Sequence, residues 1–127
     1  MPSIERPLSG DMLVFDLDEE LTKARSNQAL KEHGRIAKTL AKDGPLRVIL
    51  VVLDAGGTLE EHQTAGPVTI QPLEGDVRLS LEGTMEPVAV GQLITLGAGV
   101  PHGVESRDGG AFLLTVCHPP AATKDGP

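Results

Sequence analysis

A chain of 127 residues with a formal net charge of −7 has room for one domain and little else. The acidic excess disfavours nucleic acid and membrane surfaces as partners, because both are bound through Lys and Arg. No run approaches the roughly 20 apolar residues that span a bilayer, and residues 1–5 lack a signal-peptide layout. The single cysteine, Cys117, rules out an internal disulfide framework, so we expect a reducing, cytoplasmic location.

The scarcity of aromatic side chains disfavours further classes of function. The chain has no Trp, no Tyr and only two Phe. It therefore has little with which to stack bases or sugar rings. It also has no phenol group that a catalytic site can use as an acid or base.

The first predicted element is a helix that begins near residue 18. Acids at 18–20 favour a first turn because they complement the helix macrodipole, and Leu21 follows. The end of the helix is open to two interpretations. Residues 36–41 repeat apolar side chains at helical spacing, but 35–42 can also pair as a strand with 46–53. We favour the strand.

Short apolar runs between 15 Gly and 10 Pro predict a many-stranded β domain. Residues 46–53 are almost continuously apolar and β-branched, which is typical of a strand buried on both faces. Gly75 is expected to take a positive φ in a turn, and residues 108–110 are expected to form a hairpin turn. The other predicted strands are 12–15, 68–71, 77–81, 88–90, 93–96 and 111–116.

Two segments within residues 55–106 resemble the sequence motifs of the cupin superfamily, G-x5-H-x-H-x3-4-E-x6-G and G-x5-P-x-G-x2-H-x3-N. The matching residues, in order, are Gly56, His62, Gly75, Gly91, Gly99 and His102. The resemblance extends over about 35–118 and is closest to small RmlC-like cupins with an H-x-x-x-G-P segment, here 62–67. It implies an all-β, double-stranded β-helix (jelly-roll) barrel with a short N-terminal helix and arm.

The resemblance implies a single cupin domain over residues 1–127. Residues 1–34 are assigned to the N-terminal arm and helix, and residues 35–118 to the barrel. Residues 119–127 are small, polar and rich in Pro, and are expected to form a flexible tail.

Small cupins commonly pair through their N-terminal segments, so the resemblance also implies a homodimer. The apolar strand expected at 12–15 has no evident partner inside the barrel. An exposed strand edge invites pairing with another chain.

In cupins, side chains of both motifs bind a divalent metal inside the barrel. Only His62 and His102 remain here, since Thr64 and Val68 occupy the second His and the Glu positions. Glu60 lies two residues before His62, so an extended strand points both side chains the same way and makes Glu60 a candidate third ligand. The expected cofactor is one divalent transition metal, Fe, Mn, Ni, Cu or Zn.

Two functions stay open for the interior pocket. One is a metal-dependent dioxygenase or isomerase acting on a small organic molecule, and the other is a non-catalytic module that binds or senses a small ligand. General-base catalysis by His62 or His102 ranks below both, because cupin epimerases pair the base with a Tyr. No catalytic residue is assigned. The residues expected to line the pocket are Thr64, Val68, Ile70, Leu79 and Leu96.

Overall fold

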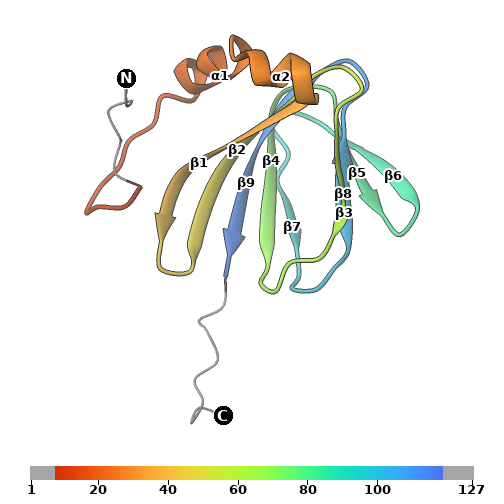
Figure 1. Cartoon of the computed structure of the whole chain (residues 1–127). Helices are drawn as coiled ribbons and strands as arrows, with labels where there is room; N and C mark the ends of the chain where they lie inside the picture. Colours follow the sequence, from red (N-terminus) through yellow and green to blue (C-terminus); the bar gives the residue numbers. More distant parts are fainter. Residues whose placement is uncertain (1–7, 119–127) are drawn as a thin grey trace, which may run out of the picture.

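A computed structural model describes residues 8–118, which form two helices and nine strands (Figure 1). In chain order they are α1 (Leu17–Arg25), α2 (Gln28–His33), β1 (Arg35–Asp43), β2 (Leu46–Leu53), β3 (Thr58–His62), β4 (Val68–Gly75), β5 (Val77–Leu81), β6 (Thr84–Val88), β7 (Ile94–Leu96), β8 (His102–Glu105) and β9 (Gly110–Cys117). Within residues 8–118, neither helix has the length and hydrophobicity of a membrane-spanning segment. The tail predicted at 119–127 lies outside the described residues.

The strands form two antiparallel sheets that face each other. One sheet has the order β1-β2-β9-β4-β7, and the other has the order β3-β8-β5-β6. Non-consecutive strands lie side by side in both sheets, which is the topology of a jelly roll. The expected jelly-roll fold is confirmed, although the two sheets keep separate edges and do not close into a continuous barrel.

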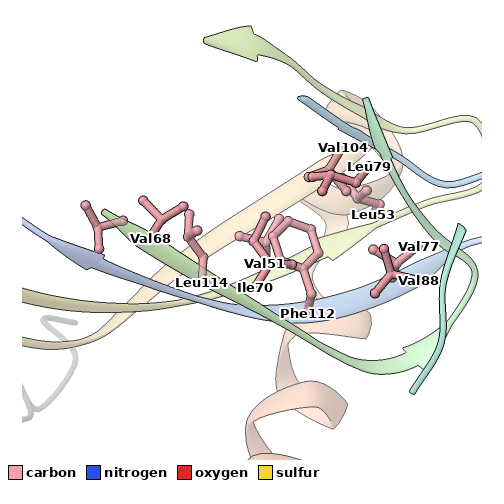
Figure 2. Close-up of a cluster of buried hydrophobic side chains, with 11 residues drawn as sticks. Val51, Leu53, Val68, Ile70, Val77, Leu79, Val88, Val104, Phe112 and Leu114 are labelled. Atoms are coloured by element: carbon pink, nitrogen blue, oxygen red, sulfur yellow. The ribbon is translucent and has the colours of Figure 1, made fainter. Parts of the chain in front are cut away.

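Strand β2 is buried on both faces, as its sequence predicts. Val51 and Leu53 point into the core between the sheets, whereas Leu50 and Val52 pack under the helices. Figure 2 shows the inter-sheet core, in which Phe112 of β9 is fully buried. Each buried aliphatic side chain contributes about 1.5–3 kcal/mol to folding, so this core holds the two sheets together.

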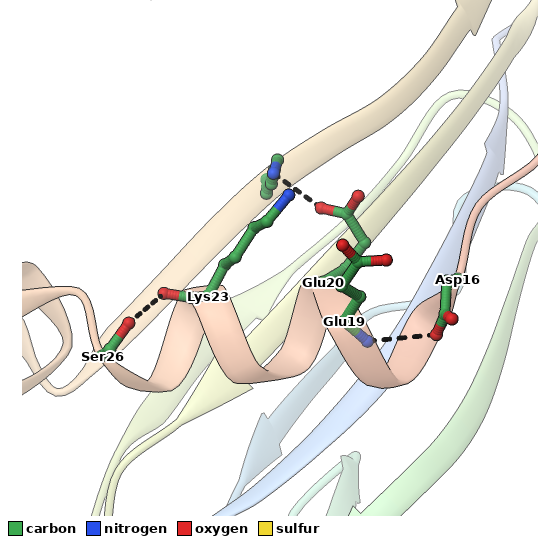
Figure 3. Close-up of polar contacts among 6 residues, drawn as sticks. Asp16, Glu19, Glu20, Lys23 and Ser26 are labelled. Carbon is green, nitrogen blue, oxygen red and sulfur yellow. Dashed lines mark hydrogen bonds and ion pairs between the residues drawn. The ribbon is translucent and has the colours of Figure 1, made fainter.

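Helix α1 begins where the acids predict it. Asp16 is its N-cap, and its side chain accepts a hydrogen bond of 3.1 Å from the backbone N of Glu19 (Figure 3). The buried carboxylate of Glu20 contacts Lys38 Nζ on β1 at 2.6 Å. This ion pair fixes the helix to the outer face of the larger sheet.

The segment after α1 settles the choice left open at residues 35–42. A second helix, α2, has Asn27 as its N-cap and Gly34 as its C-cap, and the φ of Gly34, 77°, is left-handed. The chain then enters β1, which pairs with β2 along its whole length. The strand interpretation is therefore confirmed. Ile36 and Leu40 pack under the helices, and a register shift between Thr39 and Ala41 interrupts the two-residue alternation of the strand.

Three local predictions differ from the structure. Residues 108–110 do not join a hairpin, because β8 pairs with β3 and β5 while β9 pairs with β2 and β4. Residues 12–15 join no strand ladder. The strand expected at 88–90 lies instead at Thr84–Val88, a polar edge strand that tolerates Pro87 and so carries no apolar signal. Gly75 has the expected positive φ, 75°.

Candidate ligand pocket and histidine pair

Two histidines meet where β3 ends and β8 begins. His62 lies directly opposite His102 in the antiparallel pair, so both side chains point to the same face. Their ring centroids are 4.5 Å apart and the ring planes are inclined by 55°. The fold therefore brings the histidines of two distant segments into contact.

Each imidazole is held by the backbone carbonyl two residues before it in the chain. Nδ1 of His62 lies 2.9 Å from the carbonyl O of Glu60, and Nδ1 of His102 lies 2.9 Å from the carbonyl O of Val100. A carbonyl oxygen only accepts hydrogen bonds, so each Nδ1–H is the donor. In the neutral rings, Nε2 is therefore the nitrogen with a free lone pair, which can accept a hydrogen bond or bind a metal.

The two rings differ in exposure. His102 is buried, with 1 % of its surface exposed, whereas His62 is partly exposed. Only His62 is among the residues that line the adjoining pocket. His62 is thus placed to touch a ligand, and His102 supports its ring from the interior.

The pocket beside His62 lies between the two sheets and has a volume of about 390 Å³. Its wall combines the larger sheet with strand β3 of the smaller sheet. The lining residues are Arg35, Ala37, Ile49, Val51, Leu59, Glu60, His62 and Leu114. An apolar wall with a few polar groups at this volume is typical of small-ligand sites.

A β-bulge separates Glu60 from the histidine pair. Leu59 lies opposite Val104 and His62 opposite His102, so one extra residue of β3 is accommodated between them. The bulge breaks the two-residue alternation on which the assignment of Glu60 as a ligand rested. Glu60 still borders the pocket.

The histidine pair offers two imidazole groups of the kind that bind transition metals. Within residues 8–118, no three His, Cys, Asp or Glu side chains are grouped so that they can hold a metal ion. Catalytic zinc sites, for comparison, typically have three protein ligands. Two imidazoles fit part of a transition-metal coordination sphere, but the described residues do not complete the set, and no reaction step is assigned to a metal.

Four of the five residues predicted to line the interior pocket lie in or against the core between the sheets. Val68, Ile70 and Leu79 are buried in the inter-sheet core, and Leu96 packs against it. Thr64 donates its hydroxyl to the carbonyl O of Gly66 at 2.9 Å. None of the five forms part of the wall of the pocket beside His62.

Of the residues that form the wall, the sequence pointed to His62 and Glu60 but not to the others. The two-residue alternation of side chains along 46–53 places Ile49 and Val51 on the face opposite to Leu50 and Val52, which pack under the helices. This signal in the sequence could have identified Ile49 and Val51. No local signal marks Arg35 or Leu114, because they join the wall only through the register of β1 and β9 with β2.

Comparisons with known proteins identify the fold. No protein-family model matches the chain, and no curated protein matches it. A conserved protein of unknown function from Streptococcus pyogenes superposes with a TM-score of 0.67 at 22% identity, covering 94% of this chain and 100% of that protein.

Two further solved structures are described as cupins. A cupin-2 domain protein from Shewanella frigidimarina gives a TM-score of 0.66 at 11% identity, over 83% of this chain and 95% of that one. The cupin domain of an XRE family transcriptional regulator from Enterobacter cloacae gives 0.60 at 16% identity, over 68% and 98%. The chain has the cupin fold.

Proposed function

We propose that this chain binds a small, largely apolar organic molecule in the pocket between its sheets, with His62 as a polar contact. The pocket carries the proposal, because aliphatic side chains from both sheets surround an imidazole within a volume of about 390 Å³. Ile49, Val51, Leu59 and Leu114 supply the apolar surface. Apolar ligand surface removed from water there contributes roughly 25 cal/mol per Å².

The polar contact is held in place before a ligand arrives. The bond from Nδ1 of His62 to the Glu60 carbonyl fixes the ring orientation, and the buried His102 ring packs against it. Within residues 8–118, Nε2 of His62 has no hydrogen-bond partner. A fixed ring loses little conformational freedom on binding, which favours affinity.

A pocket-filling variant tests the proposal with the neutral fluorophore phenylnaphthylamine. Ala37 is exposed on β1 and lines the pocket, so Ala37→Trp fills it without disturbing the core. Ala89→Trp is the matched control, because Ala89 is exposed after β6 and lies off the wall. We expect saturable fluorescence enhancement in the wild type and Ala89→Trp, and none in Ala37→Trp. Equal enhancement in all three proteins would rule out this pocket.

A second candidate is a metal-dependent dioxygenase or isomerase. The observation in its favour is that both histidines hold Nδ1 on a backbone carbonyl, an arrangement usual for metal-ligating His. Metal content after incubation with Fe, Mn, Ni, Cu or Zn tests it. Near-stoichiometric metal in the wild type, lost in both His62→Ala and His102→Ala, supports the candidate. Wild type that stays empty with every metal retires it.

A further inference from the structure

We infer that the ligand of the pocket is a carboxylate with an apolar body, and that Arg35 selects it. This inference rests on the proposed binding function and specifies the chemical class of the ligand. It is drawn from the position of Arg35, its hydrogen bond and its lack of a counter-ion in the described structure.

Arg35 connects the two sheets at the pocket. It is the first residue of β1, and it lies opposite Leu53, so its side chain lies on the core-facing side of the sheet. Its Nη1 donates a hydrogen bond of 3.1 Å to the carbonyl O of Thr58, the first residue of β3. This bond holds the exposed Arg35 side chain beside the pocket that it lines.

Arg35 has no ion-pair partner among residues 8–118. Arg25 pairs with Glu74 and Arg78 pairs with Asp76, but none of the ion pairs there includes Arg35. A guanidinium group has five N–H donors and stays charged at all relevant pH values. Its remaining donors match a carboxylate, which it binds with two parallel hydrogen bonds.

The rest of the wall sets the shape of such a ligand. The aliphatic side chains of Ile49, Val51 and Leu114 accommodate a hydrocarbon body. Glu60 is the one acidic residue of the wall, and its carboxylate repels an anion. Arg35 and Glu60 therefore act on the ligand with opposite sign. A ligand that carried an ammonium group would depend on Glu60 instead.

Calorimetric titration with octanoate and its neutral amide, octanamide, tests the inference. Four proteins are compared: the wild type, Arg35→Gln, Glu60→Gln and Arg47→Gln. Arg47→Gln is the matched control, because Arg47 donates to the Gly44 and Leu46 carbonyls and lies off the wall. Gln at position 35 retains a donor for the Thr58 carbonyl.

We expect Arg35→Gln to weaken octanoate binding about tenfold, since charge-assisted hydrogen bonds have this magnitude at their lower end. Octanamide affinity should stay unchanged in Arg35→Gln, and Glu60→Gln should strengthen octanoate binding several-fold. Arg47→Gln should alter neither. In the wild type, raising NaCl from about 0.05 M to about 1 M should weaken octanoate selectively, which tests the charge without any variant.

The contrary results distinguish a failure of the carboxylate inference from a failure of the proposed binding function. If octanamide binds as tightly as octanoate, and Arg35→Gln and salt change neither, the carboxylate inference is overturned while the pocket stands. Loss of octanoate affinity in Glu60→Gln also overturns it. If neither compound binds the wild type, the proposed binding function fails, and the inference fails with it.

Discussion

His62 and His102 lie directly opposite each other at the ends of β3 and β8, with ring centroids 4.5 Å apart. The pair joins the ligand pocket to the buried interior, because His62 lines the pocket and His102 has 1 % of its surface exposed. We therefore expect different roles for the two histidines, His62 in the proposed ligand binding and His102 in stability.

Alanine substitutions at the two positions should separate these roles. His102→Ala removes a buried ring and its hydrogen bond to Val100, so we expect a loss of about 2–4 kcal/mol in the free energy of unfolding. His62→Ala removes a partly exposed ring and should cost less than about 1 kcal/mol. Urea denaturation at neutral pH measures both. Equal losses in the two variants would contradict the division of roles.

Acid should weaken the hydrogen bond that ties the loop between β8 and β9 to Asp76, which lies between β4 and β5. Asp76 Oδ2 accepts a hydrogen bond of 2.7 Å from the backbone N of Arg107. That bond, together with the Arg78 side chain, holds the pKa of Asp76 below its ordinary value of 3.8. Because the pKa is lower in the folded state, the stabilisation is present above pH 3.8 and is lost as pH falls through the folded-state pKa.

Asp76→Asn tests this account of the carboxylate. The variant should be less stable than the wild type near pH 7, and the difference should shrink as the pH falls below 3.8. Urea midpoints across that range measure the effect. A difference that stays constant with pH would show that the Asp76 carboxylate does not contribute through its charge.

Ser106 carries a buried hydroxyl that has no hydrogen-bond partner within residues 8–118. Its backbone N and O are satisfied by Gly57 and Gly56. Since an unsatisfied buried hydroxyl costs free energy, Ser106→Ala should leave stability unchanged or raise it by up to about 1 kcal/mol. A loss of more than about 1 kcal/mol in urea denaturation would instead show a partner such as an internal water.

We further propose a homodimer formed through the N-terminal segment. Met12 and Val14 expose 80 % and 81 % of their surfaces, and Leu8 hydrogen-bonds through its carbonyl to Lys42 N on the edge strand β1. Exposed apolar side chains beside a free strand edge favour pairing between chains. Removal of residues before Leu17 should therefore give monomers or insoluble protein.

Point variants test the dimer without truncation. Met12→Asp combined with Val14→Asp should give monomers in light scattering. Met85→Asp, at an exposed Met on the other sheet, is the control and should leave the dimer intact. An unchanged dimer in the double variant and in the truncated chain would contradict the proposal.

The sequence predicted elements whose signal is local. The burial of β2 on both faces and the acidic start of α1 follow from side-chain patterns within one segment, and the structure confirms both. The jelly-roll fold followed from a resemblance carried by glycines and two histidines. Pairing between strands is not a local signal. The glycines at 108–110 indicate a turn, but they do not show that β9, which follows it, pairs with β2 and β4.

The site depends on register, which the sequence does not display. Glu60 was expected to point the same way as His62 along a regular strand, and the bulge that interrupts this alternation arises from the pairing of β3 with β8. Arg35 contributes to the pocket because β1 pairs with β2 so that Arg35 lies opposite Leu53. The histidine pair could therefore be predicted from the sequence, whereas most residues of the pocket wall could not.

The most direct test of the pocket is methyl-resolved NMR of the full chain titrated with phenylnaphthylamine, whose aromatic rings shift nearby methyl resonances. We predict the largest shifts at Ile49, Val51, Leu59 and Leu114, with Leu21 of α1 and Leu30 of α2 unaffected. Saturating shifts confined to the pocket methyls would locate the ligand between the sheets. Shifts centred on Leu8 and Leu13, which line a smaller pocket near the N-terminal segment, or no shifts at all, would contradict the account.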